Sequence, residues 1–341
     1  MKKLVVFLVL LIFPFSVFAY SNRVILGGET LGIQISGNGV LVVGFYKVDG
    51  KFINEKLKVG DSILSVDGES VNDVTKLVEL IDKYMANESV TIVYERDGKE
   101  YTDYLELVDV DGNYKTGLYV KGSIVGIGTL TYIDPETKVY GALGHVINES
   151  KTNKKIEVRE GFTYNSLVKS FTRSVDGKPG SKNADIDYST LFGTVLKNTN
   201  YGIFGNVKTD INGEETIEVG NIEDVFAGLA YIYTTDANNK VKEYEIEIVE
   251  IDKTSKEKNY YFEVTDEELL EMSGGIVQGM SGSPIVQNNK IIGAVTRVVV
   301  DDVSRGYGIN IVTMLEEGEN KSFGWTKVFS WEKFGNNGKV W

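Results

Sequence analysis

The chain has 341 residues, with 36 basic and 49 acidic side chains, a formal net charge of -13, 42% hydrophobic residues and no cysteine. This length indicates two domains rather than one, and the excess of acid argues against a nucleic-acid partner, because such binding neutralises phosphates with Lys and Arg. Without Cys, disulfides, thiol catalysis and Cys-based metal sites are excluded.

The start of the chain, residues 1–20, predicts an export segment. Lys2 and Lys3 give it a positive beginning, residues 4–18 carry no charge, and residues 17–19 offer small side chains at the positions that a signal peptidase reads. The apolar stretch is short for a bilayer span, which needs about 20 residues. A cleaved signal peptide and a retained membrane anchor both stay open, and either places the folded protein outside the cytoplasm.

Residues 24–108 predict short strands with one amphipathic helix. Apolar residues recur at helical spacing over residues 74–84, and Asp97-Gly98 is typical of a hairpin turn. The strand candidates are residues 40–43, 62–66 and 90–94. This pattern indicates a small, mainly β domain.

Residues 57–68 resemble the signature of PDZ peptide-binding domains, in which a Gly-Asp turn precedes a strand that ends in an Asp-Gly turn. In that family a glycine-containing loop leads into the strand that binds a peptide by strand addition, and residues 28–35 are the candidate counterpart. A tight turn that needs glycine is the alternative for this loop. The resemblance implies these peptide-binding residues: Thr30, Leu31, Gly32 and Ile33.

Residues 114–341 predict a second β-rich domain, because apolar runs alternate with Gly, Asn and Asp and helical patterns are sparse. Many short strands without alternating helices favour a β-barrel or a pair of barrels. One helix is expected to start at Thr265, where Glu268 completes a capping box.

Ser281 is the candidate nucleophile of this second domain. It lies in Gly-Met-Ser-Gly-Ser-Pro, residues 279–284, where flanking glycines permit a sharp turn that exposes the hydroxyl. By resemblance to chymotrypsin-like enzymes, the backbone amides of Gly279 and Ser281 are expected to form the oxyanion hole. An ordinary Gly/Ser turn before a hairpin at Asn288-Asn289 is the alternative.

His145 is the sole histidine and the candidate general base, and it precedes the serine as in chymotrypsin. A buried core histidine is the alternative. No metal site is expected, because zinc would have to be held almost entirely by carboxylates. The acid that would orient the imidazole is open among Asp266, Asp185 and Asp187, and Asp266 also suits the first turn of a helix.

Residues 141–145, residues 274–284 and the preceding PDZ pattern together resemble the SpoIVB (stage IV sporulation protein B) serine peptidase family. The resemblance implies a chymotrypsin-like peptidase domain, no cofactor, and Asp266 as the triad acid. It further implies cleavage of a membrane-associated regulator, and of the enzyme itself, between the mother-cell and forespore membranes, so that a late sigma factor is activated under PDZ control.

Two other functions stay open. One is a secreted PDZ scaffold without catalysis. The presence of both a lone His and a Ser flanked by glycines argues against it. The other is a quality-control peptidase similar to the HtrA family, in which PDZ domains usually follow the protease instead of preceding it. In either peptidase the expected partners are a protein substrate and a peptide or C-terminal ligand of the PDZ domain.

Overall fold

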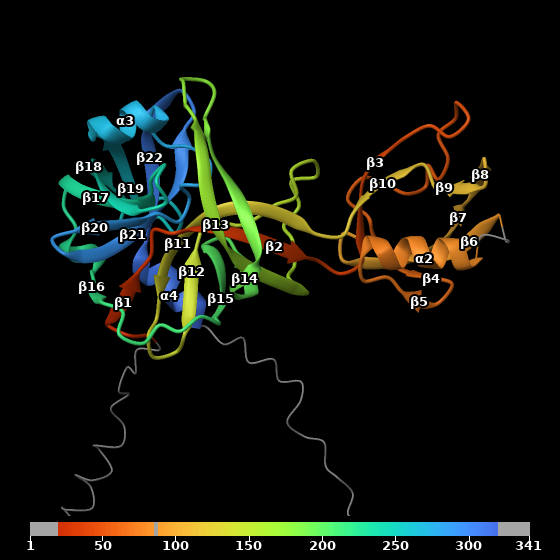
Figure 1. Cartoon of the computed structure of the whole chain (residues 1–341), viewed down its shortest axis with the longest axis horizontal. Helices are drawn as coiled ribbons and strands as arrows, with labels where there is room; N and C mark the ends of the chain where they lie inside the picture. The colour runs from red at the N-terminus through yellow and green to blue at the C-terminus, as the bar shows by residue number, and fades with distance from the viewer. Residues whose placement is uncertain (1–19, 85–87, 320–341) are drawn as a thin grey trace, which may run out of the picture.

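The computed structural model describes residues 20–84 and 88–319, which form a double-barrel domain and a smaller domain beside it (Figure 1). The large sheet of the double-barrel domain closes on itself twice. The mainly β fold with a chymotrypsin-like barrel domain, predicted from the sequence, is confirmed.

The first barrel is closed because β12 pairs with both β11 and β15. Its core contains Leu31, Ile33, Leu130 and Tyr140, all at most 2% exposed. The strands of this barrel are β2 (Thr30–Ser36), β11 (Ile124–Ile133), β12 (Val139–Ala142), β13 (Glu160–Thr172), β14 (Ser181–Thr199) and β15 (Gly202–Val207).

The second barrel closes in the same way, through the pairing of β22 with both β19 and β21. Its strands are β17 (Gly228–Thr235), β18 (Val241–Ile251), β19 (Tyr260–Val264), β20 (Pro284–Gln287), β21 (Lys290–Val299) and β22 (Asp302–Asn310). Two short strands join the barrels, β1 (Arg23–Leu26) and β16 (Thr216–Val219). Two helices complete the domain, α3 (Glu267–Ser273) and α4 (Ile311–Glu319).

The smaller domain packs α2 (Val74–Tyr84) on a sheet with the order β10-β3-β4-β6-β7. The predicted strands, the helix and the hairpin at Asp97-Gly98 are all confirmed. Its strands are β3 (Val40–Phe45), β4 (Ser62–Val66), β5 (Glu69–Ser70), β6 (Ser89–Arg96), β7 (Lys99–Glu106), β8 (Val108–Val110), β9 (Asn113–Lys115) and β10 (Leu118–Lys121).

Two strands at or just after the predicted boundary at residue 24, β1 and β2, pair with strands of the double barrel in this structure. β2 lies between β11 and β13, so the smaller domain is inserted into the first barrel between β2 and β11. Leu31, Ile33 and Ile35 alternate inward as in any half-buried strand, and this local pattern fits either domain. We call residues 40–121 the inserted domain.

Two further predictions concern chain segments at the periphery. The helix expected from Thr265 begins two residues later, at Glu267, with Asp266 as its N-cap. Of the predicted export segment, residues 1–19 lie outside the described residues, as do residues 320–341 of the predicted second domain. In the part of the chain that the structure describes, no helix is long and apolar enough to cross a bilayer.

Candidate active site

Ser281 lies in a tight turn between α3 and β20, in the second barrel. Gly279 and Gly282 have φ values of +97° and +95°, which residues with a Cβ rarely adopt. A Cβ on Gly282 would also lie 2.1 Å from the carbonyl oxygen of Thr129. Both glycines are therefore required by the backbone path that presents the serine.

The first barrel holds this turn through β11. Thr129 N–H donates to the Ser281 carbonyl at 2.9 Å, and the Thr129 hydroxyl donates to the Gly279 carbonyl at 2.8 Å. The Thr131 hydroxyl donates to the Gly282 carbonyl at 2.8 Å. Because all these threonine groups are buried, the serine turn is fixed across the junction of the two barrels.

The amides expected to form the oxyanion hole are those of Gly279 and Ser281. In the described residues neither N–H donates a hydrogen bond, whereas the neighbouring N–H groups of Met280, Gly282 and Ser283 all do. Such unsatisfied donors beside the half-buried Ser281 hydroxyl suit an oxyanion. Their catalytic role stays a prediction.

His145 comes from the first barrel, directly after β12. Leu143 and Gly144 have φ values of +73° and +68°, so the chain turns sharply before the imidazole. Nδ1 of His145 lies 2.9 Å from the carbonyl oxygen of Val146. Since a carbonyl can only accept, Nδ1 carries a proton, and Nε2 is left to accept one, as a general base requires.

Burial shifts the acid–base behaviour of this imidazole. Desolvation lowers the pKa of His145, the bond to the Val146 carbonyl raises it in part, and the positive charge of Arg297 lowers it further. The net pKa lies below the usual value for histidine. The ring is therefore neutral, and available as a base, at neutral pH.

His145 and Ser281 line one pocket of about 380 Å³ at the junction of the barrels. Its remaining walls are mostly apolar side chains from β2, β11 and the segment around His145. The pocket is therefore a mostly apolar concavity with a few polar groups, as is typical of binding sites.

No hydrogen bond joins the serine to the imidazole among the described residues. The Ser281 hydroxyl instead donates to the Thr296 carbonyl at 3.1 Å. Thr296 lies at an irregularity where β21 slips against β22, between Val295 and Arg297. If Ser281 is the nucleophile, its hydroxyl has to leave this carbonyl and turn toward Nε2 of His145.

Asp266, the acid implied by the family resemblance, is not brought to His145. Its carboxylate caps α3 by accepting a hydrogen bond from the N–H of Leu269 at 2.9 Å, and it also accepts one from the N–H of Glu245 at 3.3 Å. The lining of the pocket contains no carboxylate. The observed contacts of Asp266 are those of a helix cap, and a catalytic role of Asp266 stays a prediction.

The alternative acids are also engaged elsewhere. Asp185 forms an exposed ion pair with Lys169 at 3.4 Å. Asp187 accepts from the hydroxyls of Ser189 and Thr190, and these bonds lower its pKa. The Val146 carbonyl is thus the group that fixes the imidazole tautomer in this structure.

The predicted peptide-binding residues Thr30, Leu31, Gly32 and Ile33 do not form an open loop. They lie in β2, which is paired on both edges. A Cβ on Gly32 would lie 2.5 Å from Ile186, so this glycine is needed for close packing. Strand addition requires a free edge, which β2 does not offer in this structure, and the peptide-binding role of these residues stays a prediction.

A free edge is present in the inserted domain at β10, the terminal strand of its sheet. The strand directly follows Gly117, whose φ is +70°. Gly122, just after the strand, lies close to the start of α2, because a Cβ added to it would be 3.3 Å from the backbone nitrogen of Val74. The run Gly117-Leu118 has the glycine–apolar pattern sought earlier at residues 28–35. Sequence reasoning missed it because the earlier run has the same local pattern.

Lys182 is a further buried group that the sequence did not single out. It is 2% exposed, and its amine lies 3.1 Å from the Thr30 hydroxyl and 2.8 Å from that of Thr234. Desolvation lowers the pKa of Lys182 to about 7. The backbone N–H of Lys182 donates to the carbonyl of Gln278 at 2.8 Å, so this lysine contacts the segment that directly precedes the Ser281 turn.

The two closed barrels, with Ser281 from one and His145 from the other, define a two-barrel serine peptidase that carries an inserted domain. Residues 30–107 match the PDZ domain family. Residues 112–315, more than half of the chain, match SpoIVB peptidase S55. The chain belongs to this family of serine peptidases.

Solved structures similar to this chain include the Rv3671c protease in its inactive form, with 13% identity and a TM-score of 0.35 over 56% of this chain and 82% of that chain. The active form from M. tuberculosis gives 14% identity and a TM-score of 0.33 over 58% and 75%. None of the curated proteins matches this chain.

Proposed function

We propose that this serine peptidase is an exported signalling endopeptidase of sporulation, which cleaves a membrane-associated regulatory protein, and itself, to activate a late sigma factor. Membership of the SpoIVB peptidase S55 family supports the proposal. The proposed place of action is the space between the mother-cell and forespore membranes. The charge-free segment 4–18 supports export and membrane association.

The single observation that carries the catalytic part is the meeting of His145 and Ser281 in one pocket, from different barrels. In the proposed reaction Ser281 attacks the peptide carbonyl while Nε2 of His145 takes its proton. The amides of Gly279 and Ser281 stabilise the oxyanion, and His145 then returns the proton to the leaving amine. All four roles use groups of this chain, with no cofactor.

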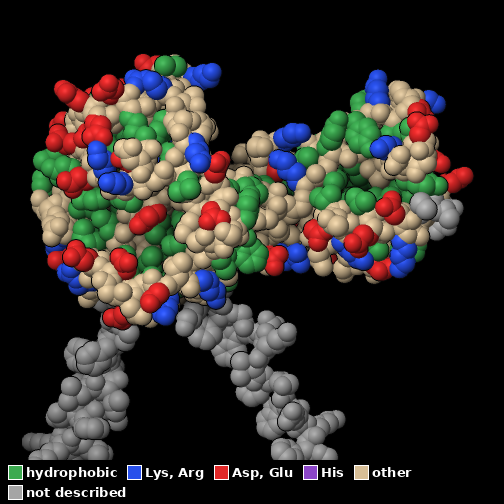
Figure 2. All heavy atoms as spheres, in the orientation of Figure 1, with side chains coloured by type: hydrophobic (Ala, Val, Ile, Leu, Met, Phe, Trp, Pro, Cys, Tyr) green, Lys and Arg blue, Asp and Glu red, His purple; other side chains and the backbone are tan. Residues whose placement is uncertain are grey.

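The inserted PDZ domain supports a narrow choice of substrate. We propose that a peptide segment of the substrate, or the chain's own N-terminal segment, adds as a strand to the free edge of β10. Lys and Arg are interspersed with Asp and Glu on the visible face of both domains (Figure 2), which suits a protein ligand better than a nucleic acid.

The test is labelling of the full chain with a fluorophosphonate, followed by mapping of the modified residue. We expect label on Ser281, none in Ser281→Ala, and a fall of at least about 10⁴-fold in the labelling rate of His145→Ala. Label on another residue, or unchanged labelling of either variant, contradicts the assignment of these residues.

The signalling role is tested separately. In an endospore former that lacks its own peptidase of this family, the wild-type chain should restore expression of a reporter driven by the late mother-cell sigma factor, and Ser281→Ala should not. Equal reporter expression with both chains contradicts a proteolytic signal. An active peptidase that restores nothing contradicts the sporulation role alone.

A further inference from the structure

The segment that follows His145 is a hairpin whose base is held in the first barrel and whose tip contacts the inserted domain. Ile147 faces Ile156, Asn148 bridges to Lys155, and Glu149 bonds to Lys154. We call residues 147–156 the bridging hairpin. Residues 145–148 line the catalytic pocket, so the base and part of the substrate wall belong to the start of this segment.

The barrel end of the hairpin is held by Asn198, which is 4% exposed at the end of β14. Its side-chain oxygen accepts from the N–H of Ile147 at 2.8 Å, and its amide donates to the carbonyls of Ile147 and Ile156 at 2.8 and 2.9 Å. The two arms are thereby closed two residues beyond the catalytic imidazole.

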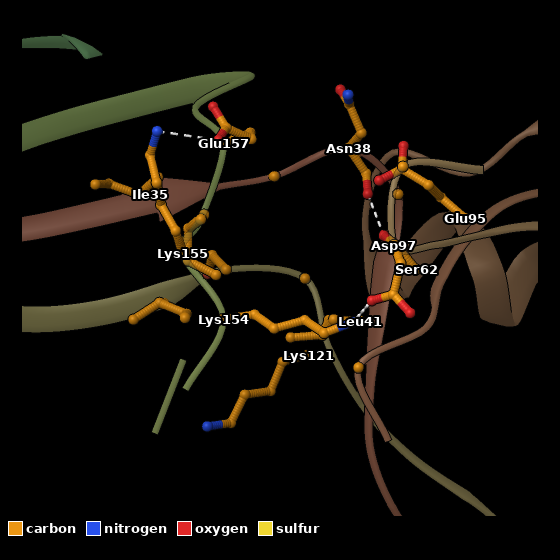
Figure 3. A pocket seen from close by; sticks show the side chains of 18 residues that line it. Ile35, Asn38, Leu41, Ser62, Glu95, Asp97, Lys121, Lys154, Lys155 and Glu157 are labelled. Carbon is orange, nitrogen blue, oxygen red and sulfur yellow. Dashed lines mark hydrogen bonds and ion pairs between the residues drawn. The ribbon is translucent and has the colours of Figure 1, made fainter. Parts of the chain in front are cut away.

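The tip of the hairpin contacts the inserted domain at three places. Lys151 donates to the carbonyl of Val43 in β3 at 3.2 Å, and Lys154 pairs with Asp97 in the turn between β6 and β7 at 2.7 Å. In Figure 3 the Lys154 side chain extends across the space between the domains toward Asp97. The third contact is the pair of Lys121 with Glu149, whose nitrogen and oxygen are 3.4 Å apart.

Burial decides which of these contacts carries most weight. Lys154 and Asp97 are 44% and 75% exposed, and solvent screens ion pairs between exposed groups so that they add little stability. The Glu149 carboxylate is 0% exposed and also accepts the N–H groups of Lys151 and Thr152, both at 2.8 Å. It therefore shapes the tip of the hairpin and cannot lose its partners without leaving buried groups unpaired.

We propose that Glu149 is a positioning residue that links the PDZ domain to the catalytic base, by fixing the bridging hairpin after His145 and tying it to Lys121. Lys121 is the last residue of β10, the strand whose free edge is open to a peptide. A peptide added to that edge would alter the position of Lys121 and, through Glu149, that of the hairpin and His145. The proposal rests on catalysis by His145 and Ser281 and is independent of the sporulation role.

The experiment is a double-mutant cycle on the full chain, with kcat and KM measured for an activated ester and with the fluorophosphonate labelling rate as a second readout. Lys121→Met and Glu149→Gln should each lower kcat about 10- to 100-fold, the size expected from a small misplacement of a catalytic group. KM should stay within about twofold, because the base acts in the chemical step. The double variant should be no slower than the slower single variant.

Two controls separate positioning from a general loss of stability. Lys121→Arg keeps the charge and should retain kcat within about threefold. Lys56→Met breaks an ion pair with Asp103 inside the same domain, where the nitrogen and oxygen are 2.8 Å apart, and should leave kcat unchanged. Thermal unfolding of every variant is recorded beside the kinetics.

Several results would overturn the proposal. Wild-type kcat in Lys121→Met or Glu149→Gln, single effects that multiply in the double variant, or an Arg variant as slow as the Met variant each contradict a link through this pair. A wild-type chain that neither labels nor hydrolyses removes the peptidase assignment and the proposal together, whereas an active wild type with unaffected variants removes the proposal alone.

Discussion

The two candidate catalytic residues, Ser281 and His145, are held in different ways. The Ser281 turn is held entirely within the double barrel, by the buried hydroxyls of Thr129 and Thr131 and by Gly282 N–H, which donates to the Val295 carbonyl at 2.7 Å. His145 instead begins a hairpin held by side chains, at one end in the barrel and at the other in the inserted domain. The candidate nucleophile thus lies in a turn held by the barrels alone, whereas the candidate base begins a segment that also contacts the inserted domain.

The largest loss of activity is expected from a substitution in the Ser281 turn. Gly282→Ala places a Cβ 2.1 Å from the Thr129 carbonyl oxygen, at a φ of +95°. Backbone cannot yield there without separating the barrels, so we expect either loss of soluble protein or a fall in kcat of more than about 100-fold. Catalytic rate and thermal unfolding are the measurements.

The matched control is Gly177→Ala, which has a similar φ of +81° but no atom within 4 Å of the added Cβ. It carries the cost of a positive φ alone, about 1–2 kcal/mol of stability, and should keep its catalytic rate. Equal loss of activity in the two variants would show that strain, rather than the contact between barrels, explains the effect of Gly282→Ala.

A smaller effect is expected on the histidine side. Asn198→Asp keeps the size of the side chain but replaces two N–H donors with an oxygen that faces the carbonyls of Ile147 and Ile156. We expect kcat to fall about 10- to 100-fold as the start of the hairpin shifts. A fall in the unfolding temperature with kcat unchanged would show that Asn198 supports the barrel and not the base.

The packing beneath the serine turn should depend on pH through Lys182. The folded state holds its pKa at about 7, against 10.5 for an exposed lysine, so the unfolded chain binds a proton that the folded chain lacks between these values. Stability should therefore rise with pH above 7, with a slope of about 1.4 kcal/mol per pH unit from this group.

The measurement is the free energy of unfolding in urea between pH 7 and pH 9. The wild-type slope should exceed that of Lys182→Met by about 1.4 kcal/mol per pH unit, and the difference should fade below pH 7, where both states are protonated. Parallel pH curves for the two chains would mean that the amine stays charged beside Thr30 and Thr234.

The sequence predicts the elements that depend on neighbouring residues, but not those whose partners are distant in the chain. The strands at 40–43 and 62–66, the helix at 74–84 and the Asp97-Gly98 turn depend on neighbours in the chain, and all were predicted. Both partners of β2, the strands β11 and β13, lie about 90 to 130 residues further along the chain, beyond the inserted domain. No local pattern distinguishes that strand from a PDZ strand.

The residues of the candidate site also fall into those that a local motif predicts and those that only the folded structure brings to notice. Ser281 and His145 carry motifs in their own segments, and the structure places both at one pocket. Lys182 and Glu149 gain their roles only from burial against distant segments, so an isolated Lys or Glu in the sequence gave no signal. The free edge at β10 could be found only after β2 had been assigned to the barrel.

Asp266→Asn is expected to have the smallest effect on kcat, and it tests directly whether Asp266 orients His145. Asn caps helices as well as Asp does, and the Asp266 carboxylate is bonded to the N–H groups of Leu269 and Glu245. With the imidazole held by the Val146 carbonyl, we expect kcat within about threefold of wild type and little change in the unfolding temperature. A fall of about 10⁴-fold, the effect of a wrong tautomer in chymotrypsin, would instead require the catalytic conformation to bring Asp266 to His145. The base would then depend on a movement of the second barrel in addition to the bridging hairpin.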